Sequence, residues 1–181
     1  EKKRTFKSKG TTDIITTEKY LINTKDVILN NENKIISSKN ETIIEDPDGN
    51  LVSLENFEYS AQNNIFKSVG NIKINDEKGN AYQFSQIYID TEKKEILGTD
   101  IKAFFNDNDF KINEKNKPRI FANAINLKKN KSVFQKSVFT ICDHRANDKC
   151  PPWTIQASEM LHDNKKKTIY YENAIIKVYD I

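Results

Sequence analysis

The sequence has few of the residues that mark catalysis or membrane insertion. Only 5 glycines, 4 prolines, 2 cysteines and 2 histidines occur among 181 residues. No apolar run is longer than three residues, which excludes a helix that spans a bilayer. The opening Glu-Lys-Lys-Arg leads into polar sequence and lacks the apolar stretch of a signal peptide. We therefore expect either a cytosolic protein, or a mature or truncated piece of an exported one.

Enzymes and nucleic-acid-binding proteins also find little support. The histidines are His144 and His162, and neither a Gly-x-Ser-x-Gly motif nor a glycine-rich phosphate loop is present. The net charge of +3 arises from 29 basic residues interleaved with 26 acidic ones, so the chain has no broad field of one sign. We expect a protein that is not an enzyme, needs no cofactor or metal and binds no nucleic acid.

The composition favours β-structure. Apolar residues make up 36% of the chain, charged residues 30%, and the mean hydropathy is -0.73, which suits a thin sheet better than a thick globular core. Isoleucine occurs 24 times and leucine 7 times. Isoleucine fits a pleated surface, although an AT-rich genome would raise its count as well. Since no Pro/Gly/Ser-rich stretch interrupts the chain, we expect residues 1–181 to form one domain.

Two internal repeats are visible. Asp46–Asn50 returns thirty residues later as Asp76–Asn80, and an alternating segment, a polar turn and a second short strand follow each copy. The second strands end at Gly70 and Gly98. A further pair, 121–134 and 157–170, is rich in Asn, Asp and Lys at its centre. Such turns join the two strands of a hairpin, so the repeats predict hairpins in tandem.

The segments between these turns alternate by twos, which places one face of each strand towards an apolar interior. Helical spacing is weak even at its best candidate, 158–167, where the repeat favours a hairpin. A meander of this length must curl or fold on itself to bury its apolar face. The predicted fold is therefore all-β, an elongated jelly roll or folded sandwich. Its unpaired edge strands could accept a strand from another chain.

Several motifs resemble one known family. The ending Ser68-Val69-Gly70-Asn71-Ile72 is similar to the repeat of OstA-type domains, and Glu95–Asp100 follows it more loosely. The family stretch Tyr/Phe-Thr-x-Cys, Pro-x-Trp-x-Ile/Leu-x-Ala, His-Asp and Ile-Tyr-Tyr-Glu-Asn-Ala is matched at Phe139–Cys142, Pro151–Ala157, His162-Asp163 and Ile169–Ala174. The chain thus resembles the N-terminal OstA-type domain of the LptD family of lipopolysaccharide-assembly proteins, most closely its alphaproteobacterial members. The resemblance covers Val27 to Ile181, whereas the first 26 residues match only as a degenerate repeat.

The resemblance implies a periplasmic jelly-roll domain of an outer-membrane protein. Such a domain takes lipopolysaccharide from the bridge protein LptA, which pairs with its edge strand, and passes the acyl chains to the barrel, which binds LptE. The barrel is absent from this sequence. Two other hypotheses stay open: a free-standing bridge protein of the same fold, like LptA or LptC, and a generic β-repeat scaffold or adhesion domain. End-to-end self-association of the chain is also compatible with its open edges.

A lipid carrier needs an apolar groove, and the alternating positions supply candidates for its lining. An ordinary closed core is the alternative at each position. The predicted lipid-binding residues are Ile72, Ile74, Tyr82, Phe84, Ile87, Ile89, Phe121, Ile125, Trp153 and Ile155.

The two cysteines and two lysine clusters are further candidates. Cys142 and Cys150 could form a local disulfide, and the resemblance implies that either could instead pair with a distant cysteine of the barrel. Their spacing to His144 is not that of a known zinc site. Lysines gather at two predicted hairpin turns, where they either contact lipid phosphates or are merely solvated: Lys128, Lys129, Lys131, Lys165, Lys166 and Lys167.

Overall fold

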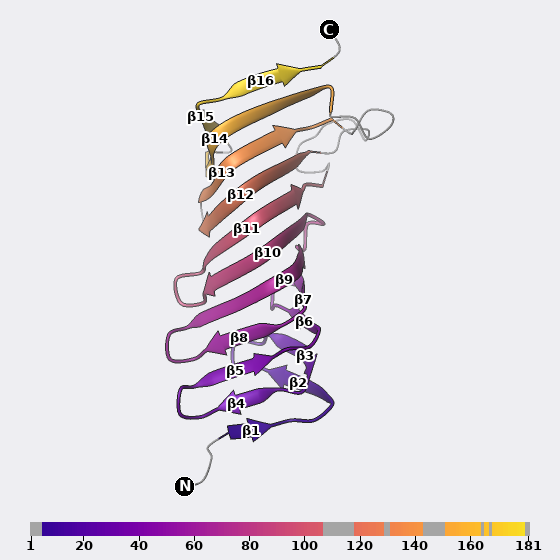
Figure 1. The fold of residues 1–181 in the computed structure, drawn as a ribbon, viewed down its shortest axis with the longest axis vertical. Coiled ribbons are helices and arrows are strands. Elements are labelled where there is room, and N and C mark those ends of the chain that lie inside the picture. Colours follow the sequence, from indigo (N-terminus) through magenta and orange to yellow (C-terminus); the bar gives the residue numbers. More distant parts are fainter. Residues whose placement is uncertain are drawn as a thin grey trace.

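The computed structural model describes residues 5–106, 118–128, 131–142, 151–163, 165–166 and 168–179. These residues form one antiparallel sheet of 16 strands, drawn in Figure 1. The all-β fold predicted from the sequence is confirmed. The strands are β1 (Thr5–Lys7), β2 (Thr11–Ile15), β3 (Leu21–Lys25), β4 (Ile28–Asn30), β5 (Ile35–Ser38), β6 (Thr42–Glu45), β7 (Leu51–Leu54), β8 (Phe57–Ser60), β9 (Ile65–Asn75), β10 (Ala81–Asp90), β11 (Glu95–Phe104), β12 (Arg119–Lys128), β13 (Lys131–Thr140), β14 (Trp153–Asp163), β15 (Thr168–Glu172) and β16 (Ile175–Val178).

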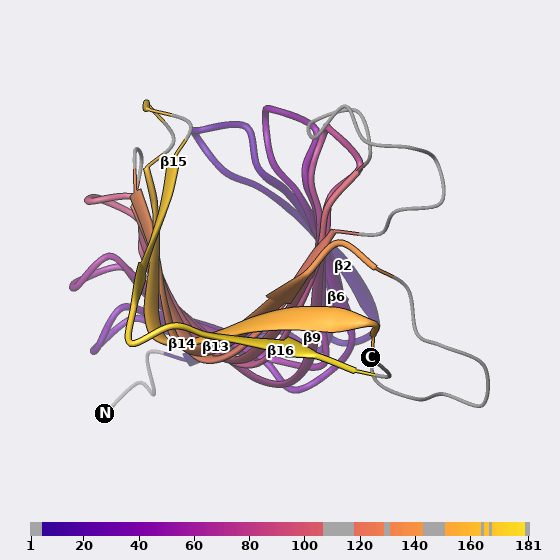
Figure 2. The same cartoon turned by 90° about the horizontal axis from the view of Figure 1, so that it is seen from above.

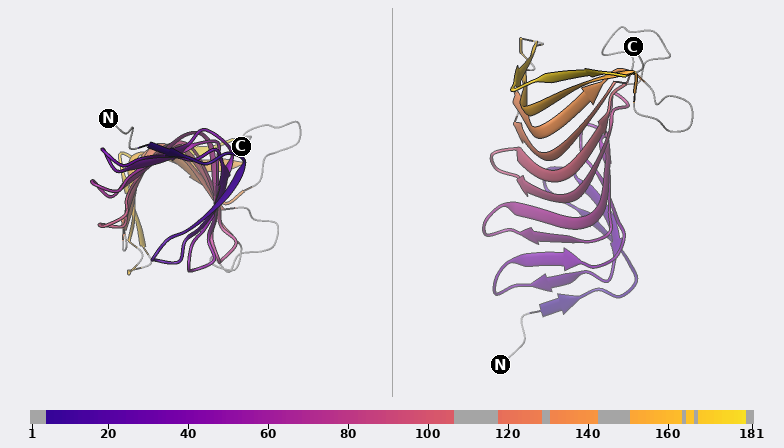
Figure 3. Two further views of the ribbon diagram at one scale, coloured as in Figure 1. Left: turned by 90° about the horizontal axis from the view of Figure 1, so that it is seen from below. Right: turned by 45° about the horizontal axis from the view of Figure 1, so that its top comes forward.

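The strands stack as rungs along one long axis, with the two termini at opposite ends (Figure 1). Seen along that axis, the sheet folds into two walls that face each other across an interior (Figures 2 and 3). Near the N-terminus the walls are separate branches of the sheet. The order β1-β4-β5-β8 forms the first wall, β2-β3-β6-β7 forms the second, and both branches pair with β9. From β9 to β14 the strands are long enough to run through both walls.

The turn that the sequence shows twice occurs three times in the structure. In Asp46–Asn50 the Asp46 N–H donates to the carbonyl of Asn50, and the Gly49 N–H donates to the carbonyl of Asp46. Both bonds recur in Asp76–Asn80 and again in Thr16–Tyr20. Lys19, Gly49 and Gly79 occupy equivalent positions with positive φ. The sequence conceals the first copy because its Asp, Gly and Asn have been replaced while the backbone bonds persist.

Two of these turns also bond to the backbone of the next segment along the axis. Asn50 Oδ1 accepts the backbone N–H of Glu77 at 3.0 Å, and Asn80 Oδ1 accepts that of Asn106 at 2.8 Å. The Asn80 side-chain amide donates to Asp76 Oδ2 at 2.8 Å. Because Asn80 is only 4% exposed, it satisfies polar groups that water reaches poorly. The repeated asparagine therefore couples consecutive rungs.

Replacing Asn80 with alanine is expected to lower the free energy of unfolding by about 2 kcal/mol, since the Asn106 N–H and the Asp76 carboxylate both lose a partner. Urea denaturation measures the loss. Lys78→Ala, in the same turn, is the matched control and is expected to change stability by less than about 0.5 kcal/mol. Equal effects of the two substitutions would contradict the coupling of rungs by Asn80.

The long strands bend where they pass from one wall to the other, and every second one has a residue with positive φ at the bend. Gly70 in β9, Asp100 in β11 and Lys136 in β13 have φ values of 115°, 51° and 49°. At Gly70 this angle suits glycine alone, since a side chain would clash with the backbone. The pairing of β9 with β10 shifts register between Phe84 and Gln86, as at a β-bulge. Such irregularities turn a sheet sharply, and here they place the two walls face to face.

Candidate functional site: an apolar trough

Directly opposed residues of neighbouring antiparallel strands point to the same side of a sheet, so the register identifies the inward face. One row of inward residues follows the first wall from end to end. It consists of Phe6, Leu29, Ile36, Tyr59, Phe66, Ile89, Ile96, Leu127, Ser132, His162 and Ile169.

A second inward row follows the second wall over the same length. It consists of Ile14, Ile22, Ile44, Val52, Ile74, Tyr82, Ala103, Ile120, Phe139, Ile155 and Ile176. This row is apolar throughout apart from the Tyr82 hydroxyl. Together with the bend between them, the two rows line what we call the trough.

The floor and the walls of the trough differ in burial. At the floor Ile72, Ile87 and Met160 are 0% exposed, as in a closed core. Many wall residues point inward yet keep part of their surface accessible, namely Ile22, Ile36, Val52, Tyr59, Ile74, Tyr82, Ile89, Ile96, Leu127 and Ile155. At the two ends of the rows, Phe6 is 64% exposed and Ile176 is 68% exposed. The closed-core alternative therefore describes the floor and part of the walls, where Phe66, Ala103, Ile120 and Phe139 are also buried, whereas the other wall residues present apolar surface along the interior.

Nine of the ten predicted lining residues share the inward face. Ile72, Phe84, Ile87 and Ile125 are buried in the floor. Half-buried positions on the second wall are occupied by Ile74, Tyr82 and Ile155, and Ile89 is half-buried on the first wall. Trp153 is half-buried near the C-terminal end, where its ring packs edge-on against Phe139 at 6.4 Å.

The prediction that Phe121 lines the same face is wrong. Phe121 lies opposite Lys102 and Val138, whereas its neighbours Ile120 and Ala122 lie opposite Ala103 and Ile101 of the core. Phe121 therefore points outward, where it packs edge-on against Phe104. The reason is the bend, because inward positions in β12 are 120 and 122 before it but 125 and 127 after it. A prediction that assumes strict alternation across the bend therefore assigns Phe121 and Ile125 to the same face.

Burial favours the uncharged form of two polar side chains on the inner face, His162 and Tyr171. His162 points inward between Ser132 and Ile169. Its pKa is lowered by burial, which favours the uncharged imidazole at neutral pH. Burial likewise raises the pKa of Tyr171, which lies on the same face opposite Met160, and so keeps its hydroxyl protonated. The inner surface of this C-terminal part thus carries no charge at these two groups.

The cysteine prediction is only half covered by the structure. Cys142 follows β13 and is half-buried, whereas Cys150 and His144 lie outside the described residues, so the disulfide stays a prediction. Within the described ranges no cluster of three or more His, Cys, Asp or Glu side chains could hold a metal ion. Nor does that part of the chain contain a helix able to cross a membrane.

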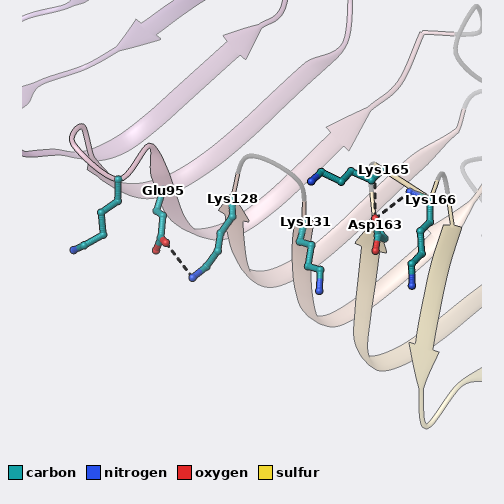
Figure 4. Close-up of a pocket in the computed structure, with 7 residues that line it drawn as sticks. Glu95, Lys128, Lys131, Asp163, Lys165 and Lys166 are labelled. Atoms are coloured by element: carbon teal, nitrogen blue, oxygen red, sulfur yellow. Dashed lines mark hydrogen bonds and ion pairs between the residues drawn. The ribbon is translucent and has the colours of Figure 1, made fainter.

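The predicted lysine clusters meet on the outer side of the first wall. Lys128, Lys131, Lys165 and Lys166 line one hollow together with Glu95, Asp163 and Lys93 (Figure 4). Lys129 and Lys167 lie outside the described residues. Sequence reasoning missed Lys93 and Glu95 because they belong to a different repeat, and only the pairing of β11 with β12 brings them alongside.

A single antiparallel sheet folded into two long walls around an apolar interior defines an elongated β-jelly roll. No family model and no curated protein matches the sequence. Among solved structures, the chain is similar to LptH, the LptA-homologous periplasmic component of the conserved lipopolysaccharide transport device from Pseudomonas aeruginosa. The TM-score is 0.55 at 6% sequence identity, and the match covers 74% of this chain and 96% of LptH. This likeness shows that the two proteins share their fold, as expected for an OstA-type domain.

Proposed function

We propose that this chain is an OstA-like domain, spanning residues 1–181, that carries the acyl chains of lipopolysaccharide through the periplasm without altering them chemically. The observation that carries the proposal is the pair of inward rows, which run without a break from the first strands to the last. A scaffold or adhesion domain has no need of such long, largely apolar inward rows, many of whose side chains stay partly accessible. The shared fold with a lipopolysaccharide-transport component supports the same function.

The energetics of such a trough suit transport. Burying a methylene group contributes about 0.8 kcal/mol, so a chain of a dozen or so carbons would gain roughly 10 kcal/mol before other costs. The rungs repeat, and each offers a similar apolar lining to the next. A lipid can therefore shift along the axis while keeping its buried area nearly constant. It meets no single deep well from which it would have to escape.

The two ends of the molecule suit docking to further conduit components. β1 and β2 are edge strands at the N-terminal end, and β15 and β16 are edges at the other end. Apolar side chains at these ends are exposed, among them Phe6 (64%), Ile15 (73%), Ile175 (59%) and Val178 (53%). Unpaired edges accept a strand from a partner. We propose that one end pairs in this way with an LptA-like bridge protein or with a second copy of this chain.

Photocrosslinking tests the trough directly. A photoreactive residue at Ile89, which is half-buried on the first wall, is expected to capture purified lipopolysaccharide on irradiation. The matched control is the adjacent Tyr88, which faces outward opposite Leu97 and is 46% exposed. It is expected to capture none. Mass spectrometry or a gel shift detects the adduct. Equal labelling at both positions, or no labelling at Ile89, would contradict the proposal.

Two versions of this function differ in what the domain is attached to. A free-standing bridge component is favoured by the match to LptH, which is covered almost completely. The periplasmic domain of an LptD-like outer-membrane protein, with LptE as a partner of its barrel, is favoured by the motif that runs from the end of β13 through β14 and β15. The sequence encoded after Ile181 distinguishes them, because a barrel requires a series of short alternating strands with aromatic girdles.

A further inference from the structure

A hollow of about 480 Å³ lies where three successive hairpins turn at the outer edge of the first wall (Figure 4). The hairpins are β10–β11, β12–β13 and β14–β15. Five of the seven lining side chains are lysines and two are carboxylates, which leaves a net formal charge of +3. The register fixes this row, since Lys128 lies opposite Lys131, and Lys131 lies opposite Asp163. The sheet therefore gathers cations that are distant in the sequence.

Two of these lysines already have anionic partners. Lys128 Nζ lies 3.0 Å from Glu95 Oε1, and Lys93 Nζ lies 2.7 Å from Asp90 Oδ2. Both pairs lie at the β10–β11 end of the hollow. The charge that they leave uncompensated is at the opposite end, around the β14–β15 turn.

Asp163 organises that turn through the backbone. Its Oδ1 accepts the N–H groups of Lys165 and Lys166, each at 3.1 Å. The Lys166 N–H is the main reason why the pKa of Asp163 lies below its usual value. The carboxylate thus fixes the turn that displays the two lysine side chains. Within the described part of the chain, the ammonium groups of Lys131, Lys165 and Lys166 form no ion pair.

Because Lys131, Lys165 and Lys166 line the same hollow, their ammonium groups offer a site for a phosphate monoester. Its charge is close to -2 and its three oxygens can each accept a charge-assisted hydrogen bond. The residues next to this row in sequence, Leu127, Ser132 and His162, point into the trough. A molecule whose chains lie against the first wall would therefore have its head group at this edge.

We propose that Lys131, Lys165 and Lys166 bind a phosphate on the head group of an amphiphile whose acyl chains lie in the trough. This inference rests on the proposed transport function, and it adds the chemical class of the head group that the domain recognises. The lipid is then held at two places, by hydrocarbon contacts inside the first wall and by charge outside it.

Binding of two defined lipids tests the inference. The probes are lipid A that carries its phosphates and the same lipid A after enzymatic removal of the phosphates. Unmodified protein is expected to bind the phosphorylated form about tenfold more tightly, because removal of the phosphates removes the acceptors of the charge-assisted hydrogen bonds from the lysines. The combined substitution of Lys131, Lys165 and Lys166 by glutamine is expected to abolish this preference and leave affinity for the dephosphorylated lipid unchanged.

The matched control replaces three exposed lysines outside the hollow, Lys39, Lys73 and Lys102, by glutamine. It is expected to keep the preference, and thermal unfolding checks that both triple variants fold. An unchanged preference in the Lys131/Lys165/Lys166 variant, or an equal loss in the control, overturns the inference and leaves the transport function standing. Failure of the unmodified protein to bind either lipid overturns both. Inorganic phosphate is the third probe, and binding as tight as that of lipid A would overturn the assignment to a head group.

Discussion

Ile96→Glu is expected to slow the passage of acyl chains through the trough by roughly a hundredfold while the sheet still folds. Ile96 is half-buried on the first wall between Ile89 and Leu127. A hydrocarbon chain that slides over this position would strip water from the new carboxylate, and the inward side chains nearby offer no cation in return. Dehydrating an unpaired charge costs several kcal/mol, which is enough to block a path that depends on a uniform apolar lining.

The matched control for this prediction is the next residue. Leu97 faces outward and is 52% exposed, so Leu97→Glu adds the same charge to the same strand outside the trough. It is expected to transfer lipopolysaccharide at the normal rate. Transfer of fluorescently labelled lipopolysaccharide from donor to acceptor vesicles measures the rates. Ile96→Thr keeps a β-branched shape without a charge and is expected to retain most of the activity. Equal slowing by the two glutamate variants would contradict a route along the inner face.

Short-range patterns in the sequence were enough to predict the fold. The period of two from Tyr82 to Phe84 and from Ile87 to Ile89 identifies β10, and the Asp76–Asn80 turn identifies the chain reversal before it. These features depend only on neighbouring residues and on the demands of a tight turn. The hairpin over 158–167 was preferred to a helix for the same reason, and β14 and β15 confirm it.

The exact lining of the trough could not be predicted, because it depends on events in the middle of strands. Every long strand from β10 to β14 bends, and the residues on either side of the bend follow different alternations. The pattern around Phe121 and Ile125 contains no sign of this change, since positive φ falls on Asp100 and Lys136 in the neighbouring strands. The first wall near the N-terminus was missed for another reason. Its strands are as short as three or four residues, too short to show a period.

The substitution Gly98→Val is expected to lower the free energy of unfolding by about 3 kcal/mol. Gly98 lies in the floor between Ile87 and Ile125 of the neighbouring strands. A Cβ atom there would lie 2.5 Å from Phe84 Cδ1, 2.7 Å from Phe84 Cε1 and 3.2 Å from Ile125 Cγ2. Phe84 and Ile125 are 4% and 3% exposed, so neither can move aside into solvent. Glycine is thus required at these two positions of the sequence repeat for different reasons. At Gly70 the reason is the backbone angle, and at Gly98 it is the overlying ring of Phe84.

A double-mutant cycle separates this packing explanation from a general intolerance of β-branching. Phe84→Ala alone is expected to cost about 3 kcal/mol through the cavity that it leaves. In the double variant, the valine side chain fills part of that cavity, so the combined cost is expected to fall short of the sum by about 2 kcal/mol. Urea denaturation of the four proteins measures the coupling. Strictly additive costs would mean that Phe84 is not what excludes a side chain at position 98, and that the floor is less tightly closed than its burial indicates.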